Sequence, residues 1–269
     1  MSAASFSQLA EFLHARSGLV LTPDKMYLVE TRLGPLMRRE GCADLAALVA
    51  KVKSALSSPI ADEVVALMTT NETLFFRDGK PFAHLQEQVL PRLAASRGPR
   101  GPIRVWSAAC STGQEAYSVA MTAAGLGPQL GGCRVEILGT DLSRDVLRRA
   151  EVGRYSQFEV QRGLPVAMLL KHFRKDGAEW VVKDDIRAMT TFREWNLLRP
   201  LAPLGRFDVI FLRNVLIYFD QQTKSRVLDQ VASVLAPDGV LYLGGSETTL
   251  GISSRFTPLD GVRSAYALA

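Results

Sequence analysis

The residues best suited to chemistry begin with one polar segment, residues 69–78, which follows one helical pattern and precedes another. It reads Thr-Thr-Asn-Glu-Thr-Leu-Phe-Phe-Arg-Asp. A connector between helices needs no such mixture of threonines, an asparagine and an arginine around two phenylalanines. Local chemistry therefore predicts a loop that holds something polar.

A second segment, residues 104–121, predicts a strand, a loop of very small side chains and a helix start. Small residues at 107–113 allow a ligand to approach the backbone, and the first turn of the helix supplies free N–H groups. The loop has one glycine, Gly113, so it lacks both the GxGxxG and the GxxxxGK[ST] patterns, which disfavours a dehydrogenase. A tight strand-to-helix turn without a ligand is the alternative interpretation.

Polar residues also end two predicted strands. Asp141 ends the strand 134–140, where an acidic residue typically accepts the ribose hydroxyls of a nucleoside; a helix cap formed by Asp141 or Ser143 is the alternative. Arg213 and Asn214 follow the apolar strand 207–212, at the end where α/β sheets bind ligands. Glu115 lies in the first turn of the predicted helix 114–124, where it could instead interact favourably with the helix dipole. Together these residues predict a nucleoside pocket without acid–base machinery.

The elements that must position these residues fall into two patterns. Residues 1–70 predict short helices, and one of them carries its apolar side chains at helical spacing: Leu45, Leu48, Val49, Val52 and Leu56. Residues 71–102 form a linking segment with a helix at 82–93. Residues 103–269 alternate strands (103–107, 134–140, 190–195, 207–212, 240–243) with helices (114–124, 144–150, 221–235), which predicts a Rossmann-like parallel α/β sheet. Residues 153–185 break the alternation and predict a small insertion.

Composition excludes several classes of protein. With 47% hydrophobic and 22% charged residues, the chain is typical of a soluble globular protein. No apolar run approaches the ~20 residues that span a bilayer, and no secretory signal is visible. Three scattered cysteines predict reduced thiols in a cytoplasmic protein with no metal site. The net charge is +5 without a dense basic run, so a nucleic-acid partner is not expected.

These motifs, in this order, resemble the chemotaxis receptor glutamate methyltransferases, the CheR family. The resemblance covers nearly the whole chain and includes TTNETLFFRD at 69–78, RVWSAACSTGQEAYSVAM at 104–121, ILGTD at 137–141, NLL at 196–198, FLRNVLIYFD at 211–220 and LAPDGVLYLGGSET at 235–248. It implies S-adenosylmethionine as the methyl donor, a receptor glutamate as the acceptor, and S-adenosylhomocysteine as a product. A glutamate with a pKa of about 4.3 is already ionised at neutral pH, so the attack needs no base.

The resemblance also implies roles for residues at matching motif positions. Contacts with the cofactor or the incoming carboxylate fall to Asn71, Thr73 and Arg77, of which Arg77 orients the carboxylate. The remaining expected contacts are Glu115 with the amino-acid part of the cofactor, Asp141 with its ribose, Asn196 and Leu197 with its adenine, Arg213 and Asn214 closing the site, and Tyr218 near the transferred methyl group.

Two departures from the family pattern affect the expectations. Gln114 and Ala116 stand where the family usually has glutamate and proline. The stretch 173–180 is shorter than the loop of members that dock on a receptor's C-terminal pentapeptide, which predicts independence from such a tether.

The expected partners are acidic helices of the receptor's cytoplasmic domain, met through Arg32, Arg38 and Arg39, which lie on one helix; a solvated charged surface is the alternative. The chain is expected to act as a monomer. Two other functions stay open: a carboxyl methyltransferase acting outside chemotaxis, and a cofactor-binding partner protein with little turnover.

Overall fold

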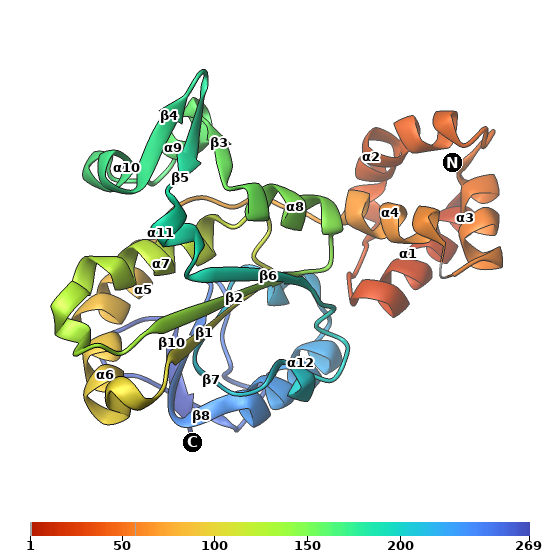
Figure 1. Cartoon of the computed structure of the whole chain (residues 1–269). Helices are drawn as coiled ribbons and strands as arrows, with labels where there is room; N and C mark the ends of the chain where they lie inside the picture. Colours follow the sequence, from red (N-terminus) through yellow and green to blue (C-terminus); the bar gives the residue numbers. More distant parts are fainter. Residues whose placement is uncertain (1, 57) are drawn as a thin grey trace. The chain divides into compact units, whose positions relative to one another are not determined.

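The computed structural model describes residues 2–56 and 58–269, which form two compact units (Figure 1). A helical unit comprises residues 1–70 with 218–223, and an α/β unit comprises residues 71–217 with 224–269.

The helical unit is built from short capped helices around an apolar core. Its elements are α1 (Ala3–Ser17), the 3₁₀ turn η1 (Pro23–Lys25), α2 (Met26–Arg39), α3 (Leu45–Ser54) and α4 (Pro59–Met68). The side chains of Ser2, Asp44 and Ser58 each accept a hydrogen bond from the backbone N–H three residues on, which satisfies free donors at the starts of α1, α3 and α4. The apolar spacing extended the predicted helix to Leu56, but α3 ends at Ser54, so Leu56 lies beyond the helix and is exposed.

A seven-stranded sheet forms the centre of the α/β unit, in the order β6-β2-β1-β7-β8-β10-β9. The strands are β1 (Ile103–Ala108), β2 (Val135–Asp141), β6 (Thr190–Glu194), β7 (Phe207–Leu212), β8 (Leu235–Leu243), β9 (Phe256–Pro258) and β10 (Ala265–Leu268). The first five strands in this order pair in parallel, and β10 pairs antiparallel with both β8 and β9. All five predicted strands are present, so the predicted Rossmann-like sheet is confirmed. The sequence pattern missed β9 and β10, and β8 begins at Leu235 rather than Val240.

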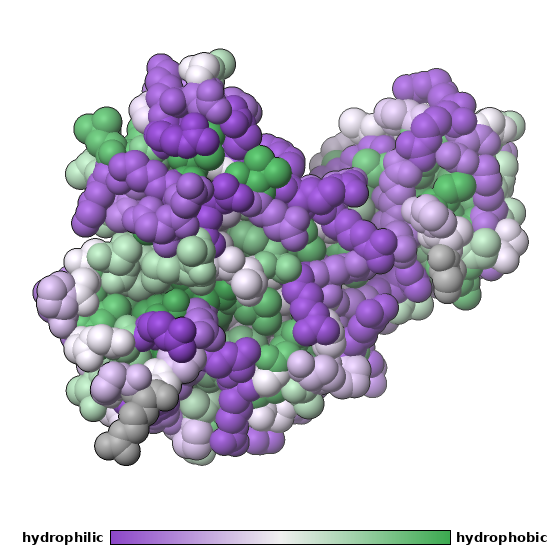
Figure 2. Space-filling view, in the orientation of Figure 1, coloured by the Kyte–Doolittle hydropathy of each residue, from purple (hydrophilic) through white to green (hydrophobic). Residues whose placement is uncertain are grey.

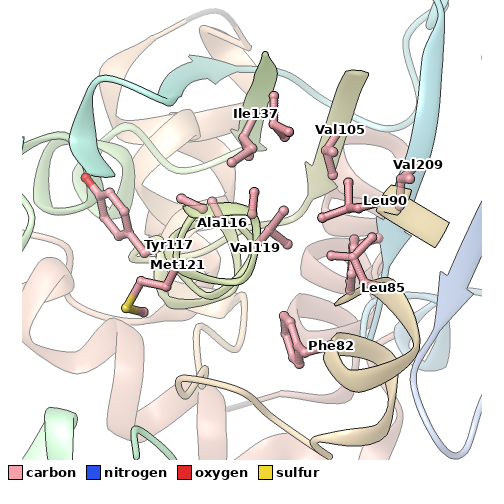
Figure 3. Packing of buried hydrophobic residues seen from close by; sticks show 14 of the residues in the cluster. Phe82, Leu85, Leu90, Val105, Ala116, Tyr117, Val119, Met121, Ile137 and Val209 are labelled. Atoms are coloured by element: carbon pink, nitrogen blue, oxygen red, sulfur yellow. The ribbon is translucent and has the colours of Figure 1, made fainter. Parts of the chain in front are cut away.

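Helices α7 (Gln114–Leu126), α8 (Arg144–Val152) and α12 (Gln221–Val234) follow β1, β2 and the β7 loop, as predicted. The linking helix is present as α5 (Lys80–His84), η2 (Leu85–Val89) and α6 (Leu90–Arg97). Figure 3 shows side chains of this helix and of α7 packed against strand residues such as Val105 and Val209.

The linking helix contains one π-helical turn, η2, which ends two residues before Pro91. Proline has no N–H, and its ring clashes with the carbonyl four residues earlier in an ordinary α-helix. The wider π turn accommodates Pro91 without ending the helix.

The insertion has its own three-stranded antiparallel sheet, in the order β3-β5-β4. Its elements are β3 (Arg154–Ser156), α9 (Gln157–Gln161), α10 (Val166–His172), β4 (Phe173–Asp176) and β5 (Glu179–Val182); α11 (Asp184–Arg187) then leads into β6. Phe75 makes edge-to-face contacts with Tyr155 and Phe173, which fix the insertion to the polar segment. In Figure 2, hydrophobic surface appears around α10, where Val166 and Leu170 are exposed.

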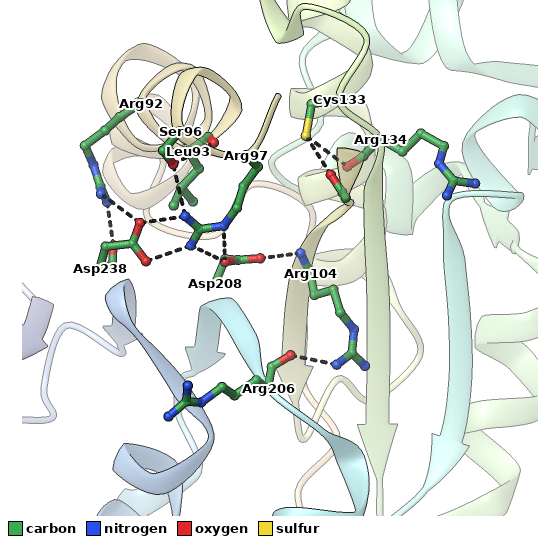
Figure 4. A network of polar contacts seen from close by, with 11 residues as sticks. Arg92, Leu93, Ser96, Arg97, Arg104, Cys133, Arg134, Arg206, Asp208 and Asp238 are labelled. Carbon is green, nitrogen blue, oxygen red and sulfur yellow. Dashed lines mark hydrogen bonds and ion pairs between the residues drawn. The ribbon is translucent and has the colours of Figure 1, made fainter. Parts of the chain in front are cut away.

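Ion pairs lie at the opposite end of the sheet from the polar strand ends (Figure 4). Arg97 donates hydrogen bonds to Asp208 and Asp238, and Asp208 also accepts from the backbone N–H of Arg104. The Arg97 guanidinium lowers the pKa of Asp238. These contacts join the linking helix to the starts of β1, β7 and β8.

Among the described residues, no helix is both long and apolar enough to cross a membrane.

Candidate functional site

Residues 71–78 of the polar segment lie across the carboxyl ends of the central strands. Three backbone contacts hold it there. The hydroxyl of Ser111 donates to the Asn71 carbonyl at 2.7 Å, and the Phe76 N–H donates to the Ser118 hydroxyl at 2.9 Å. The Arg213 guanidinium donates to the Arg77 carbonyl at 2.9 Å. Local sequence predicted only a polar loop; these contacts place it beside the loops that follow β1 and β7.

Backbone strain is concentrated in the same three loops. Left-handed backbone (positive φ) is uncommon for residues other than glycine and tends to gather at functional sites. Of the six non-glycine examples in the described chain, five lie here: Phe76 (φ 48°), Asp78 (φ 68°), Ala109 (φ 54°), Ser111 (φ 51°) and Asn214 (φ 58°). The surrounding contacts must offset this strain, which is the pattern of a preorganised binding site.

Asp141, at the end of β2, is a buried carboxylate with acceptor capacity left. One oxygen accepts from the Ser111 N–H and the other from the Ser143 N–H, each at 2.9 Å. A carboxylate can accept about four hydrogen bonds, so each oxygen keeps a position for a hydroxyl donor. Burial raises the pKa of Asp141, and the backbone N–H groups oppose that shift. Ser143, not Asp141, occupies the N-cap position of α8.

Arg213 links the polar segment to α7. Its side chain is only 2% exposed, and it donates to Glu115 at 2.9 Å and to Asp78 at 2.6 Å. Glu115 also accepts from the Ser107 hydroxyl at 2.7 Å. The Nε of Arg213 is buried and has no hydrogen-bond partner among the described residues, so one donor of this cation remains free for another acceptor. Glu115 is therefore part of the constellation, in addition to any effect on the helix dipole.

Sequence reasoning missed Glu247, in the loop after β8. Its buried carboxylate accepts four backbone hydrogen bonds, from Asn214 and Gly244 at 2.7 Å, from Val215 at 2.9 Å and from Ile217 at 3.3 Å. The signal that drew attention to Asp141, an acidic residue just after a buried strand, is also present here. The signal is weaker for Glu247, because this residue lies beyond two glycines and a serine instead of ending the strand itself.

Comparison with known proteins now decides the family. Residues 71–264 match the model described as CheR methyltransferase, SAM binding domain, and residues 4–70 match CheR methyltransferase, all-alpha domain.

The chain belongs to the CheR methyltransferase family.

Curated relatives agree over nearly their whole length. The chain is 40% identical over 257 residues to "Chemotaxis protein methyltransferase Cher2" of Pseudomonas putida, covering 93% of this chain and 92% of that protein. It is 42% identical over 255 residues to "Chemotaxis protein methyltransferase 1" of Pseudomonas aeruginosa, covering 92% of each. It is 39% identical over 259 residues to "Chemotaxis protein methyltransferase 1" of Vibrio cholerae, covering 95% of this chain and 93% of that protein. The predicted family and enzyme class are confirmed.

The donor and acceptor groups of this CheR domain fit S-adenosylmethionine. Asp141 has acceptor positions for two ribose hydroxyls, and Glu115 offers carboxylate oxygens to an ammonium group. The side chains at 107–113 are small, and Ala109 is the residue of this loop that stays partly exposed. Among the described residues, no group of three or more histidine, cysteine or acidic side chains could hold a metal ion.

The remaining predicted residues lie in different places in the CheR fold. Asn196 and Leu197 follow β6; the Asn196 side chain accepts from the Leu198 N–H at 2.9 Å, and Leu197 is buried. Arg77 directs one guanidinium nitrogen to the Glu72 carbonyl at 3.4 Å. Tyr218 belongs to the segment 218–223 of the helical unit, where its carbonyl accepts from the Val20 N–H. Its role near the transferred methyl group stays a prediction.

Proposed function

We propose that this CheR-family protein transfers the methyl group of S-adenosylmethionine to glutamate side chains of chemoreceptor cytoplasmic helices, as a cytoplasmic monomer. The products are glutamyl methyl esters and S-adenosylhomocysteine. The observation that supports this most is the constellation of Asp141, Glu115 and Arg213 under a polar segment held at the strand ends. Relatives named chemotaxis protein methyltransferase support the receptor as the acceptor.

Positioning accounts for the chemistry without a base. When bound, S-adenosylmethionine supplies a methyl group on a positively charged sulfur, which a carboxylate can attack directly. Asp141 accepts the ribose hydroxyls, Glu115 accepts the ammonium group, and Asn196 and Leu197 lie beside the adenine. Because the acceptor glutamate is ionised at neutral pH, the protein needs to align it and exclude water rather than remove a proton.

Arg77 is the residue we assign to the acceptor carboxylate. Among the described residues its side chain makes one hydrogen bond, a long one to the Glu72 carbonyl, so most of its donors remain available. A guanidinium can bind a carboxylate through two parallel hydrogen bonds, which sets both distance and orientation. Asn71 and Thr73, on the same segment, add polar contacts to the cofactor or to the acceptor.

The three arginines proposed for receptor contact differ in their surroundings. Arg32 donates to the Met68 and Thr69 carbonyls at 2.9 and 3.0 Å, and Arg39 makes a two-point contact with Glu63. Arg38 is exposed and forms no ion pair with any described residue. We therefore propose Arg38 as the main contact for acidic receptor helices, with Arg32 and Arg39 chiefly stabilising the helical unit.

We further propose that the protein works without a receptor pentapeptide. Only Gly177 and Ala178 separate β4 from β5, so the hairpin loop is as short as a tight turn permits. The test is calorimetry with a peptide ending in such a sequence. Binding of that peptide at micromolar concentration would contradict this part of the proposal.

The function as a whole is tested with labelled S-adenosylmethionine and purified receptor cytoplasmic domains. We expect base-labile label on receptor glutamates. Arg77→Ala should lower kcat/KM about 100-fold or more, because two charge-assisted hydrogen bonds are each worth roughly 1.5–3 kcal/mol. Arg255→Ala, an exposed arginine at the far end of the chain, is the matched control and should keep full activity.

The outcomes separate the candidate functions. Cofactor binding without label on any acceptor would favour a binding partner protein. Label on carboxylates of other proteins, with none on receptors, would indicate a methyltransferase outside chemotaxis. Full turnover by Arg77→Ala would remove the role assigned to Arg77 and leave the reaction itself standing.

A further inference from the structure

We infer that Glu247 is a positioning residue for methyl transfer, because its carboxylate holds the loop that carries Arg213 and Asn214 in its binding conformation. The inference rests on the proposed function, in which that loop closes the cofactor site. Glu247 itself is not required to touch the cofactor.

The Glu247 carboxylate is the anion at the centre of a ring of backbone donors. One oxygen accepts from Asn214 and Gly244, and the other accepts from Val215 and Ile217. The residue is 8% exposed, so water has little access to replace these bonds. Successive N–H groups that converge on one anion form a concave backbone nest, and hydrogen bonds to an ionised acceptor are stronger than neutral ones.

The hydrogen bonds to Glu247 explain how Asn214 keeps its left-handed backbone conformation. At φ 58° Asn214 has left-handed backbone, which is less stable than the ordinary regions for residues with a side chain, although asparagine tolerates it better than most. In this conformation of the loop, the Asn214 and Val215 N–H groups both donate to the Glu247 carboxylate. Without the carboxylate, the strain is no longer offset, and the buried N–H groups lose their partners.

The loop of Glu247 contains a second sign of the same arrangement. A Cβ atom at Gly244 would lie 2.7 Å from a Glu247 carboxylate oxygen, 2.8 Å from the Asn214 side-chain nitrogen and 2.9 Å from the Asn214 backbone nitrogen. A Cβ atom at the adjacent Gly245 would meet nothing within 4 Å. A side chain is therefore tolerated at 245 and is excluded at 244 by the contact between Glu247 and Asn214.

Arg213 connects the loop that Glu247 holds to the rest of the site. It directly precedes Asn214, and its guanidinium holds Glu115, Asp78 and the Arg77 carbonyl. A shift of the backbone at Asn214 would move Arg213 relative to those three partners. Glu247 therefore acts on the cofactor and on the polar segment through the backbone of one loop.

The test compares Glu247→Gln with Asp208→Asn in the full chain. Glutamine has the same shape but only one acceptor oxygen, so its NH₂ group faces two N–H donors. Asp208 is also 8% exposed and accepts from a backbone N–H and an arginine, but it lies at the other end of β7 (Figure 4). Both variants lose a buried carboxylate, on β7 for Asp208 and in the loop after β8 for Glu247, and only Glu247→Gln disturbs residues 213–217.

Three readouts decide the comparison: the Kd for S-adenosylhomocysteine by calorimetry, the kcat and KM for methyl transfer, and hydrogen exchange of the peptide spanning 213–217. For Glu247→Gln we expect a Kd and a kcat/KM at least ~10-fold worse, with faster exchange in that peptide. For Asp208→Asn we expect a lower Tm with Kd and exchange at 213–217 unchanged within about twofold. Wild-type Kd and exchange in Glu247→Gln, or equal losses in both variants, would overturn the inference.

A second pair of variants covers the case in which Glu247→Gln does not fold. Gly244→Ala should weaken S-adenosylhomocysteine binding and speed exchange at 213–217, whereas Gly245→Ala should match the wild type. Equal behaviour of the two alanine variants would also overturn the inference. Failure of the wild type to methylate receptors would refute the proposed function alone, because the Kd and exchange readouts do not depend on turnover.

Discussion

Replacing Arg213 with methionine should destabilise the α/β unit by about 4 kcal/mol. The guanidinium is almost fully buried and joins Glu115 to Asp78, so the substitution leaves two carboxylates without their cation. Methionine has a similar length and fills the space beside Phe82, whose ring the guanidinium faces at 5.8 Å. The change therefore tests the charge network more than the packing.

The magnitude follows from the exposure of each partner. The Glu115 side chain is 13% exposed, and removing one partner of a buried ion pair costs about 3–5 kcal/mol. The Asp78 side chain is 52% exposed, so water replaces most of its interaction and its share is about 0–1 kcal/mol. The double variant Arg213→Met, Glu115→Gln removes the unpaired charge and should recover about 2 kcal/mol of the loss.

Urea unfolding followed by tryptophan fluorescence measures this directly. Trp106, Trp180 and Trp195 are the three tryptophans of the chain and all lie in the α/β unit, so the signal reports on that unit. The free energy of unfolding should fall by about 4 kcal/mol in Arg213→Met and by about 2 kcal/mol in the double variant. Single and double variants with additive effects, or a loss below about 1 kcal/mol in Arg213→Met, would refute the assignment of a coupled buried network.

Three further perturbations have distinct expected outcomes. Gly163 has φ 88°, and a Cβ atom there would clash with the Phe75 carbonyl oxygen, so Gly163→Ala should lower the free energy of unfolding by more than about 3 kcal/mol in tryptophan-monitored unfolding. The control is Gly177→Ala, at φ 61° with nothing within 4 Å of its Cβ position, which should lower that free energy by about 1 kcal/mol. Equal losses in the two variants would contradict the clash. Burial lowers the pKa of His84 and His172 below the ordinary histidine value of about 6.5, so the unfolded chain binds more protons than the folded chain below that pH. The free energy of unfolding should be flat above about pH 6.5 and should fall as the pH decreases below it. A rise in the free energy of unfolding on acidification would exclude buried neutral histidines. Burial raises the pKa of Asp141 above 3.8, so on acidification the affinity for S-adenosylhomocysteine should start to fall at a higher pH than it would with an exposed aspartate. Calorimetry on Asp141→Asn should show weak binding without that pH dependence. The same pH profile in Asp141→Asn and the wild type would remove Asp141 from the ribose contact.

Local patterns predicted much of the site because its residues sit at strand ends. Asp141 and Arg213 each follow an apolar run long enough to identify a buried strand, and parallel strands bring their carboxyl ends to one edge of the sheet. The alternation of strands and helices from residue 103 onward also predicted the sheet, because the apolar pattern of each strand and helix repeats every few residues. The short strands β9 and β10 escaped because segments of this length have too little periodicity to stand out from loops.

Contacts between distant residues decided what the pattern left open. Arg32 donates to the carbonyls of Met68 and Thr69, so it stabilises the helical unit instead of being a free surface charge. Leu56 continues a helical spacing, yet the helix ends before it.

The sequence alone determined the family, the sheet and the residues at its strand ends, because periodicity and motif order are local properties of the chain. Only the tertiary structure showed that Glu247 holds the backbone of Asn214, and that Arg213 joins Glu115 to the polar segment. A carboxylate that binds backbone N–H groups some 30 residues away needs no particular side chains at those positions, so it leaves no pattern in the sequence.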